Sequence, residues 1–257
     1  MNPLLVLLGV VAACWHAWTD LVARVDDATT AAPLLLVFAA LAAPLATRAP
    51  LRPVGTTVPT LLLIAGALAT CIGPPIFAIA PAVLAVAWCL HAATRAGSPP
   101  AAFFGLVMLA LPILPTLEFY AAYPVRLAAI EISAALLRVQ GVAVSVEGLA
   151  LRFGGELVQF DAPCSGVKML WTCLFLASAL AWLYRFDWRR YSLALGCALV
   201  FAIAGNIVRA TSLFYVEAGL VAAKGPAWLH GTVGVVAFAF TALSLLAVLK
   251  PRAPVPA

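Results

Sequence analysis

The sequence contains little charge. Asp, Glu, Lys and Arg make up 10% of its 257 residues, whereas 65% are hydrophobic. A soluble domain carries about 25% charged residues, so this composition excludes one and indicates a polytopic membrane protein. The net charge of +5 comes from Lys and Arg scattered between apolar runs. That distribution excludes a basic patch for nucleic acid and instead reports orientation in the membrane.

Paired cysteines are also lacking. The six cysteines show no CxxC spacing, so the sequence predicts no disulfide framework and no metal site, and we expect no cofactor. Five of them lie within apolar runs, where we expect small buried hydrophobic residues; they are Cys14, Cys71, Cys89, Cys173 and Cys197. The first apolar run has no basic region before it and no small-x-small cleavage site, which predicts a retained helix and no signal peptide.

What is present is a series of apolar runs long enough to cross a bilayer. The stretch 58–93 would be about 54 Å long as one helix, far more than the roughly 30 Å a bilayer needs. Gly73-Pro74-Pro75 is expected to divide it. The sequence therefore predicts one all-α integral membrane domain over residues 1–257, with about eight transmembrane helices. The expected spans are 3–18, 31–47, 58–73, 75–93, 101–117, 164–184, 191–214 and 230–249.

The loops between these spans indicate orientation. Alternate loops hold most of the Arg residues, whereas the first loop of the opposite set, "TDLVARVDDATT", is acidic on balance. The positive-inside rule places the basic set in the cytoplasm, so we expect both termini there. The basic set is Arg48, Arg52, Arg95, Arg185, Arg189, Arg190, Lys250 and Arg252.

An outward-facing insertion, 118–163, precedes the sixth span. Its first part, "YPVRLAAIEISAALLRVQG", places charged residues among apolar ones at helical spacing and predicts an interfacial amphipathic helix. Its second part, "VAVSVEGLALRFGGELVQF", alternates apolar and polar residues between Gly-containing turns, which predicts a small β-meander. So small a meander is expected to lie on the helices, because it is marginal alone.

Three polar residues lie at one expected depth on the helices of residues 164–250. Cys164 precedes the basic loop at 185–190 by 21 residues, Arg209 follows it by 19, and His230 precedes Lys250 by 20, or about 29–31 Å of helix in each case. Short connections make successive helices antiparallel neighbours. We therefore expect the three side chains to converge near the outer surface, where an intramembrane charge indicates function.

This set favours acyl transfer through a thioester. Cysteine attacks as a thiolate, which a helix N-terminus and a nearby cation both favour. Arginine stays protonated, so Arg209 suits holding the thiolate and stabilising an oxyanion. His230 can take the proton from the thiol or give one to a leaving amine.

Five neighbours can support these three residues. Lys168 lies one turn from the cysteine, where it can act on the thiol or extend to the membrane surface. Asn206 lies one turn before the arginine and can orient its guanidinium. Asp161 can cap the helix or meet the arginine. Ser165 and Gly166 predict a compact turn whose backbone N–H groups can join an oxyanion hole.

These residues resemble the exosortase/archaeosortase family of membrane transpeptidases. The resemblance covers residues 100–250 and rests on "APCSG" at an outer helix start, "NIVR" near the end of the next helix, and a His opening the one after. It implies that Cys164, Arg209 and His230 are catalytic, and His at the third position is typical of the bacterial type. The implied substrates are exported proteins with a C-terminal motif, a transmembrane helix and a basic cluster. The implied place is the outer face of a bacterial inner membrane, often in polysaccharide-secreting bacteria.

Two other interpretations remain. The chain can be a non-catalytic membrane subunit of a polysaccharide or lipid export system, with Arg209 and His230 binding an anionic headgroup. A membrane thiol oxidoreductase would need a second cysteine near Cys164. Cys173 is nine residues further, on the opposite side of the helix and about 13 Å deeper, which argues against that chemistry.

Overall fold

The computed structural model describes residues 1–24, 28–46, 50–73, 76–112, 114–159, 166–220 and 227–250. Within these ranges the side chains of 23–24, 28–32, 76, 121 and 227–230 are not described. The chain forms two compact units. The first comprises Met1–Ile113 with Ser178–Tyr191, and the second comprises Leu114–Ala177 with Ser192–Ala257. The single domain remains a prediction, and each unit is described separately.

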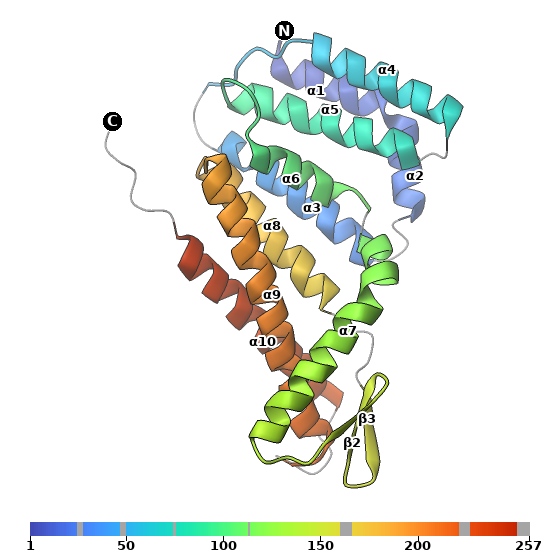
Figure 1. Ribbon diagram of the computed structural model, residues 1–257. Coiled ribbons are helices and arrows are strands. Elements are labelled where there is room, and N and C mark those ends of the chain that lie inside the picture. The colour runs from blue at the N-terminus through green and yellow to red at the C-terminus, as the bar shows by residue number, and fades with distance from the viewer. Residues whose placement is uncertain are drawn as a thin grey trace. The chain divides into compact units, whose positions relative to one another are not determined.

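The first unit is built from short apolar helices around α5 (Figure 1). Helix α5 lies against α1, α2, α3, α4 and α6. The break expected at Gly73-Pro74-Pro75 is confirmed, because α4 ends at Ile72 and α5 begins at Ile76. The elements are α1 (Pro3–Ala13), α2 (Trp15–Arg24), α3 (Ala28–Ala42), η1 (Ala43–Ala46), α4 (Thr57–Ile72), α5 (Ile76–Thr94) and α6 (Ala101–Ala110).

The second unit contains the longer helices and the sheet. The elements are α7 (Leu114–Val139), β1 (Ser145–Glu147), β2 (Ala150–Phe153), β3 (Glu156–Gln159), α8 (Val167–Leu183), α9 (Trp188–Glu217) and α10 (Ala227–Leu249). The end of α8 and the start of α9 belong to the first unit, where Ser178 Oγ and Tyr191 OH are hydrogen-bonded at 3.0 Å. The helix expected in the insertion is confirmed as α7, which begins four residues before the insertion, whereas its amphipathic, interfacial character stays a prediction.

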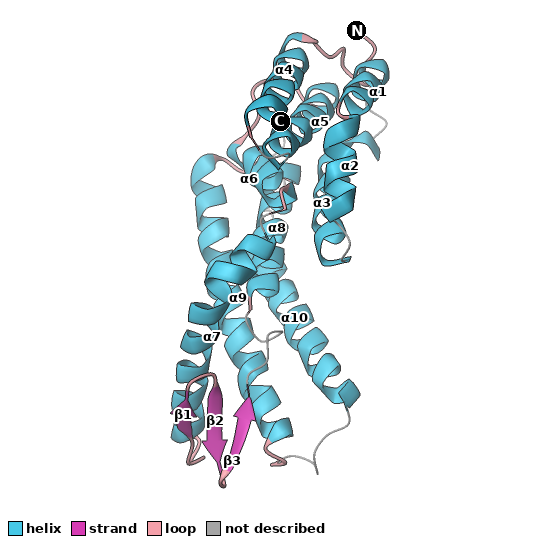
Figure 2. Ribbon diagram, turned by 90° about the vertical axis from the view of Figure 1, so that its right-hand side faces the viewer, coloured by secondary structure: helices cyan, strands magenta, loops and turns pink. Residues whose placement is uncertain are grey.

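The expected β-meander is confirmed as a three-stranded antiparallel sheet in the order β1-β2-β3 (Figure 2). Gly154 and Gly155, with φ of +60° and +88°, form the two-residue turn between β2 and β3. Positive φ at both central positions is what a type I′ hairpin turn requires. Arg152 pairs with Glu147 across the first hairpin and holds the pKa of that carboxyl below its usual range.

The sheet packs on α7 and α9, as its small size predicts. Ile130, Leu137, Leu151 and Phe214 are at most 1% exposed and belong to one apolar cluster with Ala134, Val144 and Ala210. Arg138 Nε donates a hydrogen bond of 3.0 Å to the carbonyl of Val144, and Tyr215 donates to Gln140. These contacts fix the end of α9 that follows Arg209.

The described residues contain three helices that are long and apolar enough to cross a membrane. They are Phe77–Thr94, Trp188–Glu217 and Gly231–Leu249, and the number rises to five if each of two bent helix pairs forms one span. The expected span 3–18 is divided into α1 and α2, which meet at 61°. The expected span 101–117 is divided between α6 and α7. A multi-pass membrane protein is therefore supported, whereas eight spans remain a prediction.

Helices α9 and α10 approach each other closely at a glycine. A Cβ atom added to Gly205 would lie 2.0 Å from Oγ1 and 3.0 Å from Cβ of Thr241. Small residues at such crossings let the backbones of membrane helices come close and pack by van der Waals contact. Gly205 thus sets the spacing of the two helices one residue before Asn206.

Replacing Gly205 with Leu is expected to destabilise the second unit. The side chain would meet the rigid Cβ of Thr241, and overpacking costs about 1–3 kcal/mol or more. The check is the Tm of the purified protein in detergent. Gly196→Leu is the control on the same helix, because a Cβ there meets nothing within 4 Å. Equal Tm values for the two variants would contradict the close crossing.

Candidate functional site

Helix α9 carries the two described polar side chains on which the site depends. Asn206 is 2% exposed and Arg209 is half-buried, and they lie three residues apart, about one turn of helix. The structure thereby confirms the helical placement of both residues. Their side chains contact different neighbours, one before α8 and the other within α10.

The Arg209 guanidinium lies against the backbone of α10 at Gly234. A Cβ atom at Gly234 would be 3.3 Å from Nε and from Nη2 of Arg209, and 3.4 Å from its Cζ. This contact places the cation on the stripe of α10 that contains Gly234. Residue 230 lies four positions earlier on the same stripe, because residues four apart share a helix face. The backbone position of His230 is therefore one turn from the contact, while its side chain lies outside the described part.

The Asn206 amide lies against Gly166, the residue that precedes α8. A Cβ atom at Gly166 would be 2.7 Å from Cγ and 2.8 Å from Nδ2 of Asn206. Gly166 also has φ of +75°, a conformation that residues with a Cβ rarely adopt. Its carbonyl accepts the first bond of α8, from Leu170 N at 2.8 Å. Both the backbone angle and the close approach therefore require glycine at this position.

Three of the expected site residues, Asp161, Cys164 and Ser165, lie outside the described residues. Cys164 is two residues before Gly166, and two residues span about 7 Å at most. The nucleophile, the helix cap and the serine of the turn therefore stay predictions. The structure does describe the surroundings of Gly166, the residue that follows Ser165.

Lys168 is directed toward α7 rather than toward α9. Its Nζ lies 3.9 Å from Oε1 of Glu118, and its side chain is 61% exposed. An exposed ion pair of this length contributes little stability, between about 0 and 1 kcal/mol. The pair gives the lysine a nearby carboxylate, and its action on the thiol stays a prediction.

The histidines are divided between the two units. His16 and His91 belong to the first unit, so His230 is the one histidine in the sequence of the unit that contains Arg209. His91 is buried beside the rings of Phe103 and Trp182, with Nε2 at 3.2 Å from the carbonyl oxygen of Gly97. That environment gives His91 a packing role.

The cysteines are less uniformly buried than the sequence predicts. Cys14, Cys89 and Cys173 are buried, whereas Cys197 is partly exposed and Cys71 is exposed. Within the described ranges, no three His, Cys, Asp or Glu residues lie close enough to hold a metal ion. The described acidic and thiol groups therefore point to no metal ligands.

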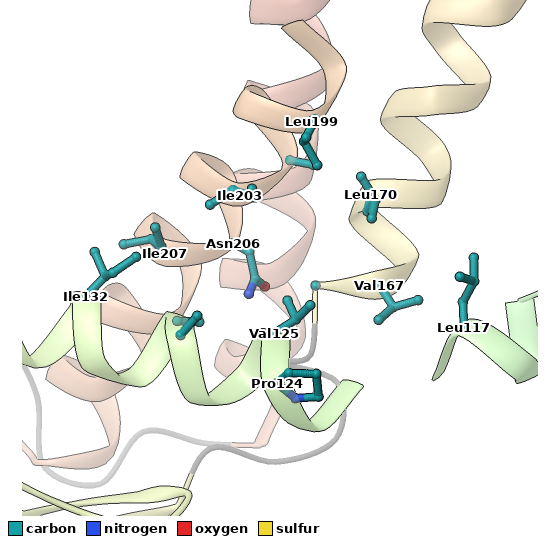
Figure 3. A pocket seen from close by; sticks show the side chains of 14 residues that line it. Leu117, Pro124, Val125, Ile132, Val167, Leu170, Leu199, Ile203, Asn206 and Ile207 are labelled. Carbon is teal, nitrogen blue, oxygen red and sulfur yellow. The ribbon is translucent and has the colours of Figure 1, made fainter. Parts of the chain in front are cut away.

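Beside Gly166 and Asn206 lies an apolar pocket between α7, α8 and α9 (Figure 3). Its volume is about 290 Å³, and Asn206 is the one polar side chain among its described lining residues. Figure 3 shows the amide pointing from α9 into this space, opposite Val125 and Val167. Asn206 and Gly166 therefore belong both to the candidate site and to the lining of the pocket.

Two features of the site were not recognised in the sequence. The contact of Arg209 with Gly234 had a weak signal, a glycine one turn after the histidine in "HGTVG". The pocket had none, because its α7 residues are ordinary apolar positions of an amphipathic helix. The contact and the pocket both depend on how helices cross, and helix crossings cannot be predicted from local sequence.

The whole sequence was compared with known proteins. A family model of transmembrane exosortases matches residues 2–247, nearly the full length of the chain. Comparisons with curated proteins and with solved structures find no match.

Proposed function

Because the chain belongs to the transmembrane exosortase family, a family of membrane transpeptidases, we propose that it is a cysteine transpeptidase acting on exported proteins. It cleaves a C-terminal sorting tail through a thioacyl intermediate and transfers the shortened protein to an acceptor. The proposed substrates end in a short motif, a transmembrane helix and a basic cluster. The proposed catalytic residues are Cys164, Arg209 and His230.

One observation carries this proposal. The Arg209 guanidinium lies on α10 within one turn of residue 230, while Asn206 on the same helix α9 contacts the residue that precedes α8. One turn of α9 thereby contacts both the residue before α8 and the part of α10 that lies one turn after residue 230. This is the arrangement expected if side chains 164, 209 and 230 converge.

The first half of the reaction forms the thioester. The Cys164 thiolate attacks the carbonyl carbon of the scissile peptide bond, and Arg209 stabilises the oxyanion that develops on its oxygen. The carbon–nitrogen bond then breaks, and His230 delivers to the leaving amine the proton it took from the thiol. The tail departs as an amine, and the exported protein remains bound to sulfur.

The second half resolves the thioester. An acceptor with an amine or hydroxyl attacks the thioester carbonyl, and His230 takes the acceptor's proton. The carbon–sulfur bond breaks, and Cys164 leaves as the thiolate that Arg209 and the start of α8 stabilise. The same oxyanion site serves both halves.

The proposed location is the outer face of a bacterial inner membrane, with both termini in the cytoplasm. The distribution of Arg residues supports this orientation through the positive-inside rule. A scissile bond next to a transmembrane tail would lie at the membrane surface, at the depth expected for Cys164.

Thiol labelling tests the proposal directly. In a variant without the other five cysteines, Cys164 is expected to react from outside with a membrane-impermeant maleimide. Half-maximal labelling is expected below about pH 8.5, the pKa of a free thiol. Arg209→Ala is expected to shift this midpoint to higher pH, because the thiolate loses its cation.

The matched control is Arg126→Ala. Arg126 is another arginine of the second unit, and its Nε lies 3.4 Å from the carbonyl of Ala122 on its own helix. This variant should label like the parent. Labelling that requires permeabilised membranes, or a midpoint that Arg209→Ala leaves unchanged, would instead favour the headgroup-binding subunit.

A further inference from the structure

The proposed transpeptidase chemistry makes no use of the pocket between α7, α8 and α9. The pocket lies wholly within the second unit, and its volume is about 290 Å³. An apolar cavity does not hold ordered water, because a water molecule needs two to four polar partners, but it can bind an apolar ligand. The described lining offers one polar side chain, Asn206, so the pocket suits an apolar ligand.

The mouth of the pocket opens beside exposed apolar side chains. Three of its lining residues are exposed and apolar: Ile132 of α7 is 42% exposed, and Leu199 and Ile203 of α9 are 46% and 47% exposed. Helix α9 is one of the described helices able to cross a membrane. Since the chain is a multi-pass membrane protein, a ligand reaches this mouth from the hydrocarbon layer.

The size of the pocket suits a small apolar group. A cavity of about 150 Å³ binds benzene, and this pocket has about twice that volume, which suits a flexible hydrocarbon chain.

The pocket also has a polar end. Asn206 marks it, as the one polar side chain of the described lining, beside Gly166. An amphiphile with its chain in the pocket would place its polar part at the end where this amide is found. We propose that the pocket binds one acyl chain of a membrane phospholipid, with the headgroup at the Asn206 end.

Photolabelling tests this site in the full chain. The purified protein is reconstituted with a phospholipid that carries a diazirine on one acyl chain, and the adducts are mapped by mass spectrometry. Adducts are expected on pocket residues such as Leu170 and Ile203. Ala202→Phe is expected to reduce this labelling about tenfold, a loss of about 1.4 kcal/mol in binding, because the added ring occupies the pocket.

Ala204→Phe is the matched control. Ala202 is 2% exposed and lines the pocket, whereas Ala204 is an exposed residue of the same helix and does not line it. Ala204→Phe should leave the labelling of Leu170 unchanged. A second blocking variant, Ala128→Phe, acts at an exposed lining residue of α7 and retains the test if Ala202→Phe fails to fold.

Labelling spread evenly over exposed helix faces and unchanged by both blocking variants would overturn the proposal. The pocket would then be assigned to an apolar side chain of the substrate and not to a lipid. The readout is binding and not turnover, so Cys164→Ala should label normally. A failure of the lipid site is therefore distinguishable from a failure of the transpeptidase chemistry.

Discussion

Replacing Cys164 with Ala is expected to abolish processing of sorting tails. Without a nucleophile no thioester forms, and loss of a catalytic nucleophile lowers turnover by about 10³-fold or more. The measurement is mass spectrometry of the C-termini of exported proteins in cells that carry only the variant. Uncleaved tails should accumulate. Cys164→Ser should give the same result, because a serine hydroxyl ionises far less readily than a cysteine thiol.

Two controls make this result specific. Cys197→Ala removes a partly exposed cysteine of the same unit, and Cys71→Ala removes an exposed one of the other unit. Both should process tails normally. A chain that works normally as Cys164→Ala but fails as Arg209→Ala would be a headgroup-binding subunit and not an enzyme.

Replacing Gly166 with Ala is expected to lower the processing rate by about 10- to 100-fold, because a shift of about 1 Å in a reacting group can cost about 10²-fold. The residue has φ of +75°, and a methyl group would lie 2.7 Å from the Asn206 side chain. Gly166 must therefore move, and we expect the cysteine two residues before it to move as well. The rate is measured as the fraction of tail cleaved over time.

Gly141→Ala separates the two causes. Gly141 also has positive φ, +83°, but a Cβ there meets nothing within 4 Å. It should cost stability without slowing cleavage. The double variant Gly166→Ala, Asn206→Ala should recover part of the rate, since the clashing amide is gone. An equal loss from Gly141→Ala would show that backbone strain alone matters.

Local signals explain what the sequence predicted well. The β-meander was recognised because its alternation has a period of two and its turns contain glycines that adopt positive φ. The break between α4 and α5 followed from Gly73-Pro74-Pro75, since proline interrupts helical hydrogen bonding. In both cases the residues that specify the structure lie within a few positions of the structure they specify.

Spans and contacts were predicted less completely. The apolar run 3–18 has the composition of one span, but the chain bends by 61° between α1 and α2. Hydropathy measures the length of an apolar run and not its straightness. Likewise, helical spacing placed Asn206 and Arg209 one turn apart, yet only the crossing of α9 with its neighbours showed that Gly166 and Gly234 receive them.

The contact between Arg209 and Gly234 has a consequence for the entropy of the reaction. An arginine side chain loses up to about 2 kcal/mol of rotamer freedom when it is fixed in one position. Here the backbone of α10, with no Cβ in the way, holds the guanidinium in the folded protein. That loss is incurred during folding, so under the proposed mechanism the cation need not be ordered again each time an oxyanion forms.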